Sequence, residues 1–131
     1  MKEKCCGAII VNNNKVLLVK QTNNVINFPK GHVEENETEI QTAIREVKEE
    51  TNLDIKILSE YRYINSYVLE NKNEKDVIFF LATAQSFDII KQEKELLDVF
   101  WCEIDKVESY LKFDNQQVLW GKVIKDIKKI F

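Results

Sequence analysis

The chain has 131 residues, of which 44% are hydrophobic, and a formal net charge of −3. This length and apolar content suit a single domain, taken here as residues 1–131, with one packed core. The negative charge gives no general attraction to duplex DNA or to an anionic membrane. No apolar run approaches the roughly 18 residues that cross a bilayer, and the charged start does not resemble a signal peptide, so we expect a cytoplasmic protein.

The cysteine and histidine content excludes several kinds of site. The three cysteines are Cys5, Cys6 and Cys102. Because their number is odd, a disulfide framework is disfavoured, and the adjacent Cys5 and Cys6 should point to opposite faces of a strand. With His32 as the only histidine and no C-x-x-C pair, neither a zinc site nor a catalytic triad is favoured.

The first third of the chain predicts a β-hairpin followed by a loop. Residues 5–11 and 15–21 are β-rich runs joined by three asparagines, which tolerate the left-handed conformations that tight turns need. Residues 21–27 are polar and predict a loop. Phe28-Pro29-Lys30-Gly31 follows, where the proline fixes one φ angle and the glycine permits an unusual approach of the backbone.

A helix is expected to begin at Thr38, because Thr38-x-x-Gln41 is a capping box. The apolar residues that should pack on the core repeat at helical spacing; they are Ile40, Ala43, Ile44 and Val47.

The remaining chain predicts further strands and two helix starts. Residues 53–69 alternate between apolar and polar and suggest one long or two shorter strands. After a turn at residues 71–76, residues 77–84 are nearly all apolar and predict a strand buried on both faces. A short strand is expected at 99–102, and helix-start signatures occur at 105–108 and 114–117. Together these elements favour an α+β or α/β sandwich in which helices cover a central mixed sheet.

Three carboxylates crowd one face of the helix expected after Thr38. Glu46, Glu49 and Glu50 stand at i, i+3 and i+4, and like charges at this spacing destabilise a helix by a few tenths of a kcal/mol per pair. Two of them also lie near the C-terminal end, where the helix dipole disfavours anions. A bound divalent cation would offset this cost, whereas the ordinary alternative is a solvated charged face.

The segment around these glutamates resembles the Nudix box, G-x5-E-x7-R-E-U-x-E-E-x-G-U, where U is a bulky aliphatic residue. The residues that match begin at Gly31 and Glu37, continue through Arg45-Glu46-Val47 and Glu49-Glu50, and end at Leu53, so that eight of nine specified positions agree. The departure is Asn52 in place of glycine, and asparagine is the next-best residue for a left-handed position after a helix.

This resemblance implies the α/β fold class, a Nudix-type α/β/α sandwich with a central mixed β-sheet, and hydrolysis of a nucleoside diphosphate linked to another group with Mg²⁺ or Mn²⁺. The implied metal ligands are the Gly31 carbonyl, Glu46, Glu49 and Glu50. The implied catalytic residues are Glu46, as base, Glu49 and Arg45. Arg45, together with Glu37, would hold the loop against the helix.

The Pro29–Glu34 segment, P-K-G-H-V-E, is similar to one branch of that family, the asymmetrical diadenosine tetraphosphate hydrolases. The branch implies cleavage of diadenosine tetraphosphate to ATP and AMP. It further implies that Lys30 and His32 contact the polyphosphate and that Glu95, with Glu93 competing for the role, is another metal ligand. Tyr67 and Phe79 are the candidates for stacking on adenine, although Phe79 also suits an apolar core.

Other substrates and one other class of function stay open from the sequence. A Nudix hydrolase could act on nucleoside triphosphates, nucleotide sugars or RNA 5′ ends. A non-catalytic module that senses nucleotides is disfavoured, because such a module is expected to lose carboxylates of the box. The expected partner is a small nucleotide, with no binding to DNA duplexes or membranes, and the protein is expected to be a monomer or a homodimer.

Overall fold

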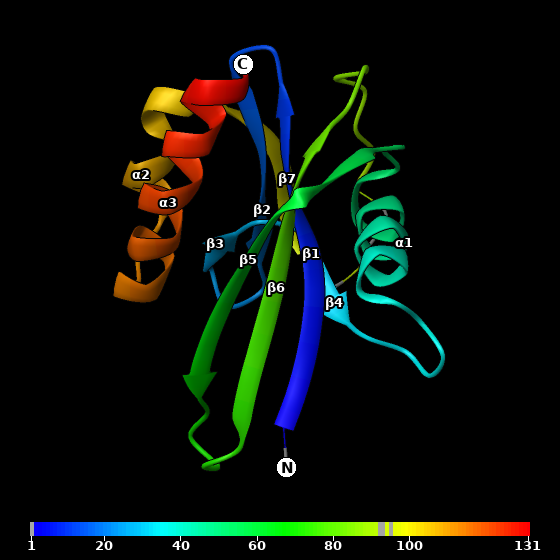
Figure 1. Cartoon of the computed structure of the whole chain (residues 1–131), viewed down its shortest axis with the longest axis vertical. Coiled ribbons are helices and arrows are strands. Elements are labelled where there is room, and N and C mark those ends of the chain that lie inside the picture. Colours follow the sequence, from blue (N-terminus) through cyan, green and yellow to red (C-terminus); the bar gives the residue numbers. More distant parts are fainter. Residues whose placement is uncertain (1, 92–93, 95) are drawn as a thin grey trace.

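A computed structural model describes residues 2–91, 94 and 96–131. In this part of the chain, a mixed seven-stranded sheet is covered by α1 on one face and by α2 and α3 on the other (Figure 1). The strands are β1 (Lys2–Asn12), β2 (Lys15–Gln21), β3 (Ile26–Asn27), β4 (Lys30–His32), β5 (Lys56–Val68), β6 (Glu74–Thr83) and β7 (Leu96–Glu103). The helices are α1 (Glu39–Thr51), the 3₁₀ turn η1 (Ile104–Lys106), α2 (Val107–Tyr110) and α3 (Asp114–Ile130).

The predicted hairpin is confirmed, and the way its strands diverge creates room for the site. β1 and β2 pair only beside the turn, at Val11 with Val16 and at Asn12 with Lys15; Asn13 has a φ of 54° in that turn. Farther from the turn, β1 pairs antiparallel with β4 and β2 pairs with β3. Along almost their whole length β1 also pairs in parallel with β6 and β2 pairs antiparallel with β7. The short strand β4 therefore lies against the middle of β1, beside α1.

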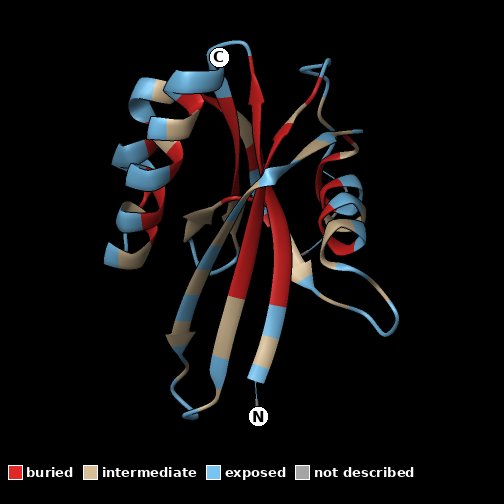
Figure 2. Cartoon of the chain, viewed as in Figure 1, coloured by how far each residue is buried: buried red, intermediate tan, exposed pale blue. Residues whose placement is uncertain are grey.

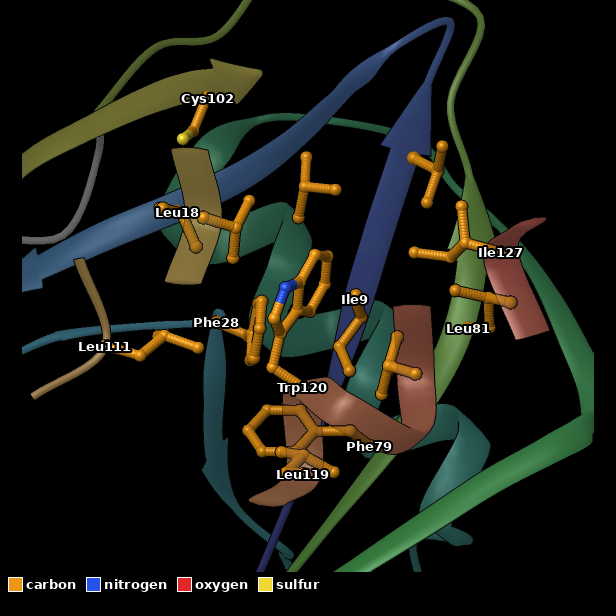
Figure 3. Close-up of a cluster of buried hydrophobic side chains, with 14 of the residues drawn as sticks. Ile9, Leu18, Phe28, Phe79, Leu81, Cys102, Leu111, Leu119, Trp120 and Ile127 are labelled. Carbon is orange, nitrogen blue, oxygen red and sulfur yellow. The ribbon is translucent and has the colours of Figure 1, made fainter. Parts of the chain in front are cut away.

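Both faces of the sheet are packed, as Figure 2 shows by the buried inner sides of α1 and α3. Cys5 and Ile9 of β1 belong to the cluster under α3, whereas Cys6 and Ala8 belong to clusters under α1. The expectation that the adjacent cysteines point in opposite directions is confirmed, and all three cysteines are buried thiols. Figure 3 shows the α3-side cluster, in which Phe28, Phe79 and Trp120 lie together.

Helix α1 begins where the sequence predicts. Thr38 is its N-cap, its hydroxyl accepts the Gln41 N–H, and the Gln41 side chain accepts the Thr38 N–H. The prediction that Ile44 packs on the core is wrong, because Ile44 is 42% exposed. The buried stripe is centred on Ala43, Val47 and Glu50, which leaves Ile44 at its solvent side.

The C-terminal half agrees with the predicted strands and corrects one helix start. β5 is a single long strand whose register with β6 shifts between Leu58 and Arg62, and residues 77–82 of β6 are all buried. α3 starts one residue earlier than the 114–117 signature implies, because the Gln116 side chain accepts the Phe113 N–H at 3.1 Å and leaves Asp114 as the first helical residue. Within the described residues, the structure contains no helix with the length and apolar character needed to cross a membrane.

Candidate active site

The three carboxylates of the box come from the last two turns of α1 and differ in burial. Glu50 is 7% exposed on the stripe that packs toward the core, the Glu46 side chain is 14% exposed and that of Glu49 is 48% exposed. They therefore run from the core edge to solvent. Asn52 ends the helix in a left-handed conformation, with a φ of 65°, and its N–H donates to the Lys48 carbonyl at 3.0 Å.

Arg45 is the hub of a charged network that ties α1 to the preceding loop. It donates to both oxygens of Glu37 at 2.7 and 3.0 Å, to Glu46 at 2.8 Å, to Glu49 at 3.2 Å and to the His32 carbonyl at 3.0 Å. The hydrogen bonds from Arg45, ahead of those from neighbouring groups, lower the pKa of Glu37 to about 2. Bonds to the carboxylates, first of all to Glu37, raise the pKa of Arg45. Glu37 and Arg45 are therefore both charged near neutral pH.

Gly31 lies directly against the Glu46 carboxylate. A Cβ atom built on Gly31 would overlap all three atoms of that carboxylate group. Because Gly31 pairs with Cys6 in the β1–β4 ladder, the strand cannot simply move aside. A glycine at this position lets the backbone of β4 and the side chain of Glu46 share one narrow space.

These groups line a cleft of about 690 Å³ between α1, β4 and residues 21–23. Carboxylate and carbonyl oxygens are the donors that a hard divalent cation prefers, so the lining of the cleft fits Mg²⁺ or Mn²⁺. Among the described residues, no three acidic, cysteine or histidine side chains already stand together as a metal site. At Glu46 and Glu49, the Arg45 guanidinium binds both carboxylates. The Glu95 and Glu93 predictions lie outside the described residues.

A second cavity of about 580 Å³ adjoins the cleft and is lined by aromatic and amide side chains, among them Tyr67, Phe79 and Asn65. Tyr67 is partly exposed, so its ring can meet a base. Phe79 is 1% exposed and packs edge-on against Phe28, with ring centroids 5.5 Å apart. At this burial Phe79 cannot stack on a base without leaving the core, so it supports the wall of the cavity.

Lys30 borders both cavities, which also share Gln21 and Asn23. Burial, and then the charge of Lys75, lower the pKa of Lys30, while Cys5, Glu50 and Glu46 act in the opposite direction. His32 lines the acidic cleft from the end of β4. Its exposed ring lies 3.4 Å from a carboxylate oxygen of Glu3.

Comparison with known proteins identifies the family. A model of the NUDIX domain matches residues 1–120. The chain belongs to the Nudix family. The asymmetrical bis(5′-nucleosyl)-tetraphosphatase of Sus scrofa is 30% identical over 135 residues, which cover 91% of this chain and 91% of that protein. The m7GpppN-mRNA hydrolase of Saccharomyces cerevisiae is 32% identical over 115 residues, or 83% of this chain and 12% of that protein.

Among solved structures, a binary complex of the C. elegans Ap4A hydrolase superposes with a TM-score of 0.87 and 26% identity, over 98% of this chain and 99% of that one. The Nudix α/β/α sandwich expected from the sequence is confirmed. The chain is thus a Nudix hydrolase with asymmetrical tetraphosphatase relatives over most of its length.

Two residues of this Nudix hydrolase escaped the sequence analysis. Lys75 lines the aromatic cavity, and its ammonium lies 6.0 Å from the centroid of the Tyr67 ring. The alternation along β6, which places Lys75 on the same face as Val77 and Phe79, could have indicated it. Gly7 lies beside Lys30 in the β1–β4 pair, and only the cross-strand register reveals this, because the two residues are far apart in sequence.

Proposed function

We propose that this Nudix hydrolase cleaves dinucleoside polyphosphates, splitting diadenosine tetraphosphate into ATP and AMP by attack of water on phosphorus. The observation that supports this most is the junction of two cavities, because Lys30, Gln21 and Asn23 line both the acidic cleft and the aromatic cavity. A nucleoside in the aromatic cavity directs its phosphates past Lys30 toward the carboxylates of α1. The printed name of the Sus scrofa relative, an asymmetrical bis(5′-nucleosyl)-tetraphosphatase, supports the same substrate class.

The proposed cofactor is Mg²⁺ or Mn²⁺, held by Glu46, Glu49, Glu50 and the Gly31 carbonyl, with Glu95 as a further candidate. Such an ion, when bound, neutralises phosphoryl charge and activates the attacking water. The Glu46 carboxylate accepts the proton of that water as general base. Glu46 is suited to this role because the Arg45 guanidinium, at 2.8 Å, keeps its carboxylate oriented toward the cleft.

The remaining residues of the proposed site bind and orient the substrate. Lys30 places positive charge, and the His32 ring an N–H donor, beside the polyphosphate of an otherwise acidic cleft. Tyr67 offers a ring face to the base, and Lys75 adds a second cation on the same side. Arg45 fixes the orientation of Glu46 and Glu49. Glu37 in turn holds the Arg45 guanidinium in place by accepting two of its N–H groups.

The test is hydrolysis of diadenosine tetraphosphate by the purified protein with and without Mg²⁺, with products separated by chromatography. We expect equal amounts of ATP and AMP, and no turnover in the presence of a chelator. Glu49→Gln should hydrolyse diadenosine tetraphosphate at least about 100-fold more slowly than the wild type, which corresponds to an activation barrier higher by roughly 2.7 kcal/mol. Glu60→Gln is the matched control, because Glu60 is an exposed glutamate of β5 that lines neither cavity. A wild-type rate no higher than that of Glu49→Gln would show the assignment to be wrong.

A panel of other phosphoanhydrides distinguishes the substrate class from the reaction type. A nucleoside triphosphate, a nucleotide sugar and a 5′-capped RNA are measured beside diadenosine tetraphosphate under the same conditions. The capped RNA is included because the yeast relative is an m7GpppN-mRNA hydrolase. A higher kcat/KM on any of these would retain the metal-dependent chemistry and replace the proposed substrate.

A further inference from the structure

We propose that Gly7 of β1 is a positioning residue, because the absence of a side chain there sets where Lys30 stands at the junction of the two cavities. This inference rests on the proposed function, since it takes Lys30 to be a contact of the polyphosphate. Gly7 itself touches no substrate and acts through the β4 strand.

The β1–β4 pair is closer than two ordinary side chains would allow. Gly7 stands opposite Lys30 in the antiparallel register. A Cβ atom built on Gly7 would lie 2.7 Å from the Lys30 Cβ and 2.8 Å from its Cα, and it would overlap the Pro29 carbonyl oxygen. Opposed Cβ atoms in an antiparallel pair usually lie about 4.5–5.5 Å apart. Lys30 therefore stands where it does only because residue 7 has no Cβ.

The segment that carries Lys30 is held in this place from both sides. The Ala8 N–H donates to the Pro29 carbonyl at 3.2 Å. Phe28 is fully buried against Phe79 and Trp120, with ring centroids 5.5 and 6.0 Å apart. Within the described chain no glycine has a positive φ, so the need for glycine at position 7 comes from close approach and not from an unusual backbone conformation.

The same register pairs Gly7 with two residues that line the cavities. On its other side Gly7 pairs with Phe79 of β6, which forms a wall of the aromatic cavity, while Lys30 borders both cavities. An added methyl group would push β4 away from β1 by a distance on the order of 1 Å. Misplacement by this amount in a binding group can cost up to about 100-fold in rate. The effect should fall first on Lys30 and Pro29, the residues that the methyl group would meet.

The test is a double-mutant cycle with Gly7→Ala, Lys30→Ala and the double variant, using inorganic tripolyphosphate as the probe in calorimetric titrations with Mg²⁺ present. We expect Gly7→Ala to weaken tripolyphosphate binding about tenfold when Lys30 is present and less than twofold in the Lys30→Ala background. Gly121→Ala is the matched control, because a Cβ atom at Gly121 meets nothing within 4 Å and Gly121 lines neither cavity. It should bind tripolyphosphate like the wild type.

Two further readouts separate positioning from a general loss of structure. Mn²⁺ affinity without tripolyphosphate should change less than tripolyphosphate affinity does in Gly7→Ala, because the glutamates of α1 lie outside β4, and with diadenosine tetraphosphate KM should rise more than kcat falls. If Gly7→Ala does not fold, Pro29→Ala loosens the same segment without adding an atom, and its effect on binding should likewise depend on Lys30.

The outcomes distinguish this inference from the proposed function. Equal effects of Gly7→Ala with and without Lys30, or wild-type binding by Gly7→Ala, would overturn the positioning role while leaving the hydrolase assignment untouched. Failure of wild-type protein to bind tripolyphosphate would also overturn it. A coupled cycle in a protein that does not cleave diadenosine tetraphosphate would support the role of Gly7 and refute the proposed substrate.

Discussion

The substitution Arg45→Lys should lower the free energy of unfolding by about 3 kcal/mol. The guanidinium reaches Glu37, Glu46, Glu49 and the His32 carbonyl at once. A lysine ammonium is a compact charge without the planar fork of a guanidinium. It should therefore keep the contact with Glu37 and lose those with Glu46, Glu49 and the His32 carbonyl.

The magnitude follows from the burial of each lost contact. A hydrogen bond between charged groups is worth about 1.5 kcal/mol when partly buried, which is the case for Glu46. The bond to the His32 carbonyl is worth about 1 kcal/mol. The pair with Glu49, whose side chain is about half exposed, contributes about 0.5 kcal/mol because water screens it. For a domain of this size the total corresponds to a fall in Tm of about 10 °C.

Urea unfolding at neutral pH, followed by the fluorescence of Trp101 and Trp120, measures this loss. Arg62→Lys is the matched control, because Arg62 also binds one carboxylate with two N–H groups, at 2.7 and 2.9 Å from Glu39, but lies outside the box. It should lose at most about 1 kcal/mol and keep the wild-type hydrolysis rate. If Arg45→Lys were as stable as Arg62→Lys, the reasoning that Arg45 is the structural hub of the box would be refuted.

Three further predictions concern the caps, the charges and the metal. Hydrogen bonds from Arg62, and also from Lys4, lower the pKa of Glu39 from 4.5 to about 2. This carboxylate therefore adds stability above pH 4.5 that is lost as the pH falls toward 2. In urea titrations, Glu39→Gln should lower the free energy of unfolding by about 1 kcal/mol at pH 7 and should have no effect near pH 2. Asn52→Ala should lower stability by about 1 kcal/mol because of the φ of 65°, whereas Asn52→Gly should equal or exceed the wild type in thermal unfolding. Removal of the cation by a chelator should abolish hydrolysis. Compared with protein in which the cation is present at about ten times its Kd, the chelated protein should lose only about 1.4 kcal/mol of its free energy of unfolding. A circular dichroism spectrum of an unfolded chain after chelation would contradict this.

Local signals in the sequence predict much of the fold because local chemistry determines those elements. Thr38 and Gln41 carry their own capping bonds, so the start of α1 can be read within four residues. The apolar run of β6 and the asparagine turn are similarly self-contained. The prediction for Ile44 is wrong because helical spacing identifies apolar residues without showing where the buried stripe is centred. In this helix the buried Glu50 lies on the stripe.

The cavities could not be predicted, because they depend on which strands become neighbours. Lys30, Gly7 and Phe79 form one row across β4, β1 and β6, although they are distant in sequence. The box motif identifies the acidic residues of the cleft and, through Gly31, the strand that faces them, but it contains no information about which strand pairs with β4. Asn65 was missed for the same reason, since it enters the aromatic cavity through the pairing of β5 with β6.

The charge arrangement of α1 has a different solution from the one that the sequence suggests first. Crowded glutamates near a helix C-terminus need a positive partner, and the sequence points to a metal ion. In the structure Arg45 already binds Glu46 and Glu49, at 2.8 and 3.2 Å, so the fold does not depend on a cation for the stability of these two. The bond to the more exposed Glu49 is the longer of the two and the easier to exchange. Under the proposed function, Arg45 would retain Glu37 and Glu46 while Glu49 turned toward an incoming ion, so the proposed metal-binding face would use residues of a helix that is already stable.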